Sequence, residues 1–453
     1  MNKPFNPSSH AAASGLQNFI DGKVVLPMDE RYSKVRQVWN GAIDRDPAMV
    51  ALCESAEDVQ AALHLARVRD LAVSVRSTGY DVAGRSVRSG GLVIDVSPMN
   101  RVEMDGRIAT VGGGATAASV ISTAAASSLV AVTGWHGIVG MTGLTLAGGY
   151  GPLLASHGLA LDHLVGAEVV LADGRCVTAD ADNNPDLFWA LRGGGGNFGV
   201  VTSMKLRLHP FRSMLAGMIL FPWSDADKVL RGYAAVAASA GNDLTVAAGL
   251  FRLPDGNPVL FLAPAWTGGP AQGEAVVADL QGLGTPFHAQ VGLTNHRELT
   301  NSFDMRVANG RHYALQTRSV GELTPNVISS IIQAGSNMSS PFSMIVLQHF
   351  RGRASQIPLE ATAFGLRRDH FMIEIIASWE PAAGDDGTNH RLWARDLSRV
   401  LALFSFPGGY PSMLGDDDRE QIAHAYGSNL TRLQDIKRRF DPDGLFSATP
   451  LPM

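Results

Sequence analysis

The stretch that decides the fold is VRSTGYDVAGRSVRSGGLVIDVSPMN, residues 75–100. It begins and ends in short apolar runs, so it predicts a loop rich in Gly and Ser between two buried strands. Four glycines, at positions 79, 84, 90 and 91, leave the backbone N–H groups open to a ligand. We therefore expect a large anionic ligand at this loop.

Length and composition set the broad class. A chain of 453 residues exceeds one ordinary core, which predicts two domains. With 45% hydrophobic and 17% charged residues, the chain is typical of a soluble globular protein. The net charge of -5 gives no electrostatic reason to expect nucleic acid or an anionic membrane as a partner. No apolar run has the length of a membrane span and the N-terminus lacks an apolar signal segment, so we expect a cytoplasmic protein.

The chain has two cysteines, Cys53 and Cys176. They lie far apart and have no metal-ligand spacing. We expect both to be buried free thiols, and we expect no metal site.

The segments around the loop have clear periodicity, whereas residues 1–15 are polar and small and are expected to be unstructured. Ser55 begins a capping-box-like segment, and the apolar positions that follow it predict an amphipathic helix. Strands are expected at 71–75, 92–96 and 108–111, and a further helix at 117–126.

Three more segments are rich in glycine. Residues 112–117 lack the acidic residue that a Rossmann site has about 20 positions on. Residues 194–199 precede the strand-like alternation of 200–208, whereas a Rossmann phosphate site needs a helix there. Residues 134–151 contain seven glycines, a density that we take as too high for a helix interior or a plain strand. They form either a backbone that a ligand approaches closely or a set of tight turns.

The composition changes after Pro210. Residues 244–253 and 258–266 flank a Pro-Asp-Gly-Asn turn and predict a hairpin. The remaining expected elements are a helix at 273–280, strands at 343–350 and 371–379, a helix at 389–403 and a helix-rich tail at 416–439. Antiparallel strands with helices on one face make an α+β domain.

Four further motifs follow the opening stretch in order. They are GWHGIVGMTGLTLAGGYG at 134–151, HGLALDHL at 157–164, NPDLFWALRGGGGNFGVVT at 184–202 and RRFDPDGLF at 438–446. With the opening stretch they resemble the FAD-linked oxidases of the vanillyl-alcohol-oxidase/PCMH superfamily, in the berberine-bridge-enzyme-like and 6-hydroxynicotine-oxidase-like branch. The resemblance implies an α+β, PCMH-type fold with an FAD domain from 1–208 and 416–453. It also implies a substrate domain, 209–415, of antiparallel sheet covered by helices.

The resemblance also assigns residues to the cofactor FAD. The loop 76–81 and the glycines of 140–151 would hold the pyrophosphate and the ring, and Asn197 with 199–201 would line the adenine side. The cofactor-binding residues implied are Arg76, Ser77, Thr78, Gly79, Tyr80, Asp81, Gly84, Ser86, His136, Gly140, Gly143, Leu144, Gly148, Gly149, Gly151, Asp162, Asn197, Gly199, Val200, Val201, Tyr410 and Asn429.

One departure from the family pattern concerns flavin attachment. Relatives carry a histidine, bonded covalently to the flavin, where this chain has Tyr80. The second attachment, a cysteine in some members, falls at or near His136. We therefore predict non-covalent FAD. Tyr80 then fills the volume of the lost imidazole or forms a hydrogen bond to substrate or flavin.

The implied activity is that of an FAD-dependent oxidoreductase. We expect an oxidase that passes hydride from a small amine, alcohol or secondary metabolite to flavin N5, with O2 as acceptor. The alternatives are a dehydrogenase or redox-neutral cyclase, and a flavin-binding protein without turnover. Either a monomer or a homodimer is compatible with the sequence.

Candidates for the catalytic base are Tyr410, which ranks first, and Tyr313, His349 and His312. Each of them is also a common packing residue on a strand. A set of phenylalanines lines an apolar pocket or forms sheet core: Phe251, Phe261, Phe303, Phe342, Phe364 and Phe371.

Overall fold

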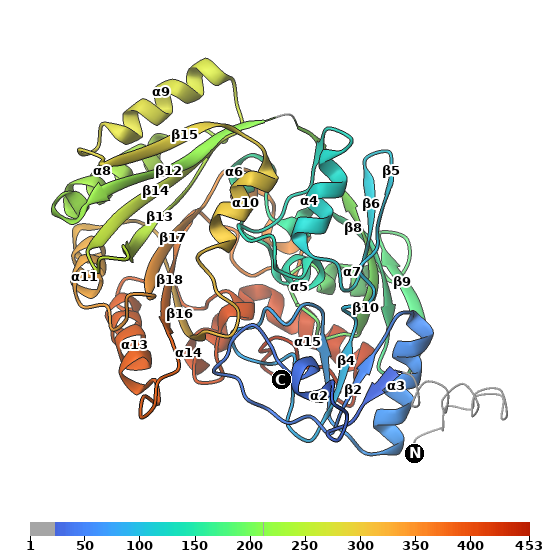
Figure 1. The fold of residues 1–453 in the computed structure, drawn as a ribbon. Coiled ribbons are helices and arrows are strands. Elements are labelled where there is room, and N and C mark those ends of the chain that lie inside the picture. The colour runs from blue at the N-terminus through green and yellow to red at the C-terminus, as the bar shows by residue number, and fades with distance from the viewer. Residues whose placement is uncertain (1–22, 212) are drawn as a thin grey trace.

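A computed structural model describes residues 23–211 and 213–453, so the expected unstructured segment 1–15 lies outside the described residues. The first half of the chain forms a four-stranded, a five-stranded and a two-stranded sheet, and the chain from Met214 to Trp379 forms one large sheet (Figure 1). The helix and strand content and the arrangement confirm the α+β class. We keep 1–208, 209–415 and 416–453 as the proposed domain bounds.

A four-stranded sheet carries the opening loop. Its order is β1 (Val24–Val25), β2 (Met49–Leu52), β4 (Leu92–Asp95) and β3 (Val73–Arg76), with β3 parallel to β4. The expected helix is α3 (Ala56–Val68), and the Ser55 side chain caps it by accepting the N–H of Asp58. The loop between β3 and β4 thus starts and ends at buried strands, as predicted.

A five-stranded antiparallel sheet follows. Its order is β5 (Val102–Asp105), β6 (Ile108–Gly112), β10 (Val200–Arg207), β8 (Leu164–Val170) and β9 (Cys176–Asp180). The helices that add side chains to its core include α4 (Ala117–Ala125), α7 (Pro185–Leu191) and, from the C-terminal tail, α15 (Leu430–Phe440). The tail therefore completes a core that the first half of the chain begins.

Two sequence expectations were wrong in this region. Cys53 is buried, but Cys176 is exposed on β9. The glycine-rich segment contains a helix, α5 (Met141–Ala147), with Gly143 in its interior. A glycine costs a helix only about 1 kcal/mol, and burial of Met141 and Leu146 in the core offsets that cost.

The large sheet is antiparallel and has seven strands. Its order is β15 (His288–Thr294), β12 (Met214–Pro222), β14 (Pro258–Trp266), β13 (Leu244–Arg252), β17 (Met344–Phe350), β18 (His370–Trp379) and β16 (His312–Val320). The predicted hairpin of β13 and β14 is confirmed. Helices α8 (Ala226–Ser239), α9 (Pro270–Gln281), α11 (Pro325–Ser336) and α13 (Thr388–Ala402) share a core with one face of the sheet (Figure 1). The opposite face of the sheet is not covered by these helices, and part of it lines the cavity described below.

The other elements are short connections. They are α2 (Tyr32–Val35), β7 (Leu129–Val130), α6 (Leu154–His157), β11 (His209–Pro210), α10 (His296–Asp304), α12 (Arg353–Gln356) and α14 (Arg419–His424). Within residues 23–211 and 213–453, no helix combines the length and apolar character needed to cross a membrane. The same residues contain no cluster of side chains suited to hold a metal ion.

Candidate active site

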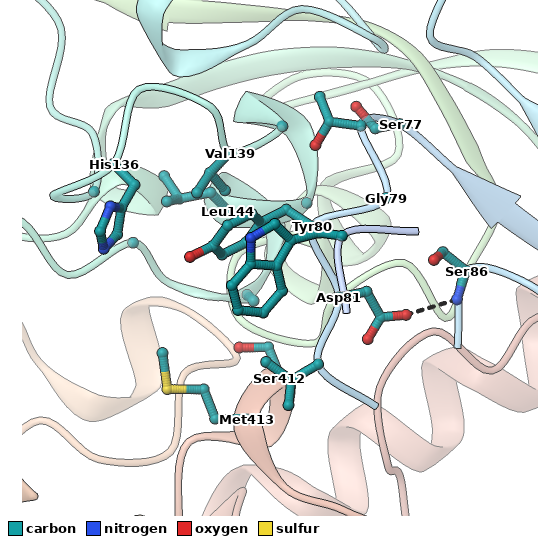
Figure 2. A pocket seen from close by; sticks show the side chains of 18 of the residues that line it. Ser77, Gly79, Tyr80, Asp81, Ser86, His136, Val139, Leu144, Ser412 and Met413 are labelled. Atoms are coloured by element: carbon teal, nitrogen blue, oxygen red, sulfur yellow. Dashed lines mark hydrogen bonds between the residues drawn. The ribbon is translucent and has the colours of Figure 1, made fainter. Parts of the chain in front are cut away.

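A cavity of about 400 Å³ lies where the opening loop, the glycine-rich segment, the C-terminal tail and the open face of the large sheet meet. Figure 2 shows this pocket, with Ser77, Gly79 and Tyr80 of the loop near Leu144 of α5. Four segments that are distant in sequence therefore share one site.

Hydrogen bonds within the opening loop give it its shape. The Asp81 carboxylate accepts the N–H of Ala83 at 3.1 Å and that of Ser86 at 2.7 Å (Figure 2). Gly79 has a φ of 73°, a conformation that favours glycine. These contacts turn the backbone of residues 77–81 toward the cavity.

Glycines form the facing wall. A Cβ on Gly140 would lie 2.7 Å from Ser77 Oγ, so the two walls approach each other closely there. A Cβ on Gly143 would meet nothing within 4 Å, because Gly143 faces the open cavity. Backbone is therefore accessible to a ligand along this wall.

The predicted cofactor residues separate into two groups. Those that line the cavity are Ser77, Thr78, Gly79, Tyr80, Asp81, Ser86, His136, Gly140, Gly143, Leu144, Gly149, Gly199, Val201 and Tyr410. Those that do not line it are Arg76, Gly84, Gly148, Gly151, Asp162, Asn197, Val200 and Asn429.

Side chains of the second group are paired with other residues of the protein. Arg76 forms a buried ion pair with Asp95 at 2.5 Å, which joins β3 to β4. Asp162 accepts two hydrogen bonds from the Arg367 guanidinium. Asn197 exchanges hydrogen bonds with the backbone of Thr449.

Asn429 and three glycines also belong to the second group. The Asn429 amide donates to the carbonyls of Leu359 and Thr362. Gly84, Gly148 and Gly151 leave room for close neighbours, since a Cβ at any of them would lie within 3 Å of another residue. Gly148 and Gly151 thus allow close approach of Tyr410 and Gly134 of the cavity wall, whereas the partners of Asn429 and Gly84 do not line the cavity.

Five polar side-chain atoms in the cavity wall are buried and have no hydrogen-bond partner among the described residues. They are Trp39 Nε1, Ser74 Oγ, Ser86 Oγ, His136 Nδ1 and Thr142 Oγ1. Because buried polar groups are normally paired, these atoms indicate a ligand with several hydrogen-bonding groups. Trp39 and Thr142 were not expected from the sequence.

Tyr80 belongs to an aromatic cluster. Its ring lies 4.3 Å from that of Trp39, and Trp39 stacks on Tyr313 at 3.9 Å. Burial raises the pKa of the Tyr80 phenol, with further contributions from Tyr313 and Glu374. Tyr80 therefore stays protonated.

The expected catalytic candidates lie in different places. Tyr410 lines the cavity, and its hydroxyl accepts the N–H of Gly149 at 3.0 Å. Tyr313 also lines it, but its hydroxyl donates to the Ala308 carbonyl at 2.8 Å. The structure places His349 on the other face of the sheet, where it stacks on Phe371 at 4.1 Å and burial lowers its pKa to about 3. His312 packs against Trp379.

Strand alternation explains the position of His349. On β17, Met344, Val346 and Gln348 line the cavity, while Ile345 and Leu347 belong to the core beneath the helices. Because successive side chains of a strand point to opposite faces, His349 lies on the same face as Ile345 and Leu347, away from the cavity. Of the six phenylalanines, Phe251, Phe261, Phe303 and Phe342 line the cavity, whereas Phe364 and Phe371 are core.

Glu374 was not expected from the sequence. This residue of β18 lines the cavity and is buried, and burial raises its pKa from 4.5 to about 7. The Gln348 amide donates to the Glu374 carboxyl, and Trp135 Nε1 donates to Gln348 Oε1 at 3.1 Å. The overlooked clue was a single acidic residue within the apolar strand sequence FMIEIIASW at 371–379.

The C-terminal segment Phe446 to Thr449 was also missed, although it lines the cavity beside Gly195 and Gly196. At the other end, His136 Nδ1 lies 3.3 Å from Asp304 Oδ1. The Asp304 carboxylate accepts the N–H of Gly137 at 3.0 Å, which fixes the position of this loop.

Comparison with known proteins gives consistent matches. An FAD binding domain model matches residues 47–180, and a model described as berberine and berberine like matches 416–450. The chain is 30% identical to (R)-6-hydroxynicotine oxidase of Paenarthrobacter nicotinovorans, over 94% of this chain and 95% of that one.

Solved structures are also similar. The crystal structure of 6-hydroxy-D-nicotine oxidase from Arthrobacter nicotinovorans has a TM-score of 0.86 at 27% identity, covering 94% of this chain and 97% of that one. Glucooligosaccharide oxidase from Acremonium strictum, described as carrying a 6-S-cysteinyl, 8α-N1-histidyl FAD, has a TM-score of 0.85 at 20% identity. That alignment covers 98% of this chain and 100% of the other.

The cavity fits FAD. Its glycine-lined walls bring backbone close to a ligand, and Ser86, Thr142 and Trp39 offer unpaired hydrogen-bonding atoms to an acceptor-rich molecule. Residues 77–81, α5 and the segment 446–449 are the parts of the chain that would hold it. This chain therefore belongs to the FAD-linked oxidoreductases of the berberine-bridge-enzyme-like and 6-hydroxynicotine-oxidase-like family.

Proposed function

We propose that the protein is an oxidase for a small amine, alcohol or phenolic secondary metabolite, with O2 as electron acceptor and Glu374 as general base. The observation that carries the proposal is the carboxyl group of Glu374. It is buried in the cavity wall and has a pKa raised to about 7 by burial. Strongly perturbed titratable groups in a cavity are typical of catalytic sites.

Glu374 would handle the substrate proton. With a pKa near 7, part of the population is ionised at neutral pH and can accept a proton from a substrate O–H or N–H. When bound, FAD supplies the acceptor for the hydride that leaves the adjacent carbon. The substrate thus loses one proton and one hydride, and O2 takes up the two electrons as H2O2.

The neighbours of Glu374 give it a fixed orientation. Gln348 holds the carboxyl group through its amide, and Trp135 holds Gln348 in turn. Tyr313 is a weaker candidate because its hydroxyl already donates to a carbonyl. We retain Tyr410 as a contact on the flavin side, since its hydroxyl meets the backbone of the glycine-rich wall.

The walls around Glu374 suit an apolar or aromatic substrate. Phe251, Phe261, Phe303 and Phe342 all line the same cavity. Such walls exclude water and favour rings over sugars, which need many hydrogen-bonding partners. That the relatives reported above are named as oxidases supports oxygen as the acceptor.

We also propose that FAD is bound without a covalent bond. The loop position at which the family carries a histidine holds Tyr80, a half-buried phenol whose raised pKa keeps it protonated and poorly nucleophilic. The glucooligosaccharide oxidase, by contrast, is described with a histidyl and a cysteinyl attachment.

Two experiments test these proposals. Acid precipitation of the purified holoenzyme should release all yellow colour into the supernatant, and a yellow pellet would contradict non-covalent binding. For the activity, anaerobic flavin bleaching is followed with panels of amines, alcohols and phenols, and air is then admitted. Fast reoxidation with stoichiometric H2O2 supports the oxidase, whereas slow reoxidation would refute it in favour of a dehydrogenase.

A further inference from the structure

Arg306 lies at the mouth of the cavity. It follows α10 and lines the cavity, although the residue as a whole is exposed. Its guanidinium carbon lies 4.4 Å from the centre of the Phe251 ring, and one of its N–H groups is 3.5 Å from the sulfur of Met218. Phe251 and Met218 are both cavity residues, from β13 and β12. The cation thus rests on the apolar wall of the site.

Arg306 has no acidic partner among residues 23–211 and 213–453. The nearby carboxylate of Asp304 is instead engaged by the N–H of Gly137. Desolvation by the surrounding protein lowers the pKa of the Arg306 guanidinium, and no acidic residue counteracts this effect. The N–H groups of this guanidinium are therefore available to an anionic group of a ligand in the cavity.

The other charged groups of the cavity wall are satisfied by protein atoms. Asp81 accepts backbone N–H groups, Arg85 pairs with Asp416, and Arg88 donates to Ser447. Glu374 receives the Gln348 amide. Among the charged side chains in the described part of the wall, only that of Arg306 has no nitrogen or oxygen atom as a partner. Its guanidinium contacts are the Met218 sulfur and the Phe251 ring.

Arg311 provides a comparison five residues further on. Its guanidinium also rests on an aromatic ring, 4.0 Å from the centre of Phe342. Unlike Arg306, it donates to a carboxylate, that of Glu380, at 2.8 Å. The aromatic contact is therefore common to both arginines, and what Arg306 lacks is an anion.

We propose that Arg306 binds a carboxylate of the substrate, so that the substrate is an aromatic or aryl-alkyl amine, alcohol or phenol that also carries a carboxylate. The inference rests on the proposed function, because it takes this cavity as the substrate site. A guanidinium matches a carboxylate with two parallel hydrogen bonds. The phenylalanine walls accommodate the ring of such a molecule, and Glu374 faces the same space.

The test measures binding to the oxidised holoenzyme, so it does not depend on turnover. The probes are benzoate, 3-phenylpropanoate and 5-phenylpentanoate, each paired with its neutral amide, and the readout is the change in flavin absorbance. Three lengths are used because the carboxylate must reach Arg306 while the ring lies among the phenylalanines. At least one acid should bind about tenfold or more tightly than its amide, as expected for a charge-assisted pair.

Variants assign the preference to Arg306. Arg306→Met should abolish the preference for the acid and leave amide binding within about twofold, since only the charged contact is lost. Arg311→Met is the matched control, and it should keep the preference. FAD content and the circular dichroism spectrum verify that each variant is folded.

The inference is overturned if no acid outbinds its amide in the wild type, or if Arg306→Met retains the preference. The outcome is separable from that of the proposed function. If the flavin is not reduced or is reoxidised slowly, the proposed oxidase activity is refuted. Loss of the preference for the acid in Arg306→Met would establish the anion subsite even in that case.

Discussion

Replacing Glu374 with glutamine keeps the shape of the side chain and removes the proposed base. General-base catalysis contributes about 10²–10⁴-fold to rate, so Glu374→Gln should lower kcat/KM by that factor. In the wild type, kcat/KM should rise with pH and level off above about 7, where the carboxyl group is ionised. The variant should lose this rise.

The same substitution should stabilise the fold at high pH. Burial raises the pKa of Glu374 from 4.5 to about 7, so the folded state binds the proton more tightly than the unfolded state does. The stability that this proton gives is fully present below pH 4.5 and is lost as pH rises through 7. At 1.36 kcal/mol per tenfold change in proton affinity, ionised Glu374 costs the folded state roughly 3 kcal/mol at pH 8.

Thermal unfolding of holoenzyme at pH 5 and pH 8 measures this difference. The midpoint of Glu374→Gln should exceed that of the wild type by several degrees at pH 8 and by much less at pH 5. Glu322→Gln is the control, because it removes an exposed carboxyl group just after β16 of the same sheet. It should leave the unfolding midpoints at pH 5 and pH 8, and kcat/KM, at their wild-type values. A Glu374→Gln enzyme with kcat/KM within threefold of wild type, or a wild-type profile that is flat between pH 6 and 8, would refute the reasoning.

Three further predictions follow from the cavity wall. Gln348→Met removes the amide that favours ionised Glu374, so the pKa in the pH profile of kcat/KM should rise above that of the wild type, and an unchanged profile would argue against the contact. Tyr80→His should yield protein whose flavin stays in the acid-precipitated pellet and fluoresces on a denaturing gel; a colourless pellet would place Tyr80 away from the attachment position. Gly143→Leu projects a side chain into the open cavity, so the FAD Kd measured by fluorescence titration should rise at least about tenfold. The free energy of unfolding of the Gly143→Leu apoprotein, measured in urea, should be about 1 kcal/mol higher than that of the wild type, because leucine is the better helix former. Gly143→Ala should raise the FAD Kd less than Gly143→Leu does.

Local patterns predicted much of the fold. The Ser55 cap, the hairpin of β13 and β14 and the strands β4 and β18 depend on neighbours in the chain, so sequence periodicity was sufficient. The helix α5 was missed because tertiary burial of its apolar side chains overrides the low helix propensity of glycine. The sequence did not show which face of β17 borders the cavity, and His349 lies on the opposite face.

The opening stretch by itself determined that residues 75–100 form a glycine-rich loop between two buried strands and that a ligand lies against its backbone, since these properties follow from residue types in local order. Only the tertiary structure decided which polar groups meet at the site. Glu374 and Gln348 meet because β17 and β18 pair in register, and Arg306 reaches the rim because a loop folds back over β12 and β13. The raised pKa of Glu374 and the unpaired charge of Arg306 arise from burial and from neighbours distant in sequence, which a linear pattern does not contain.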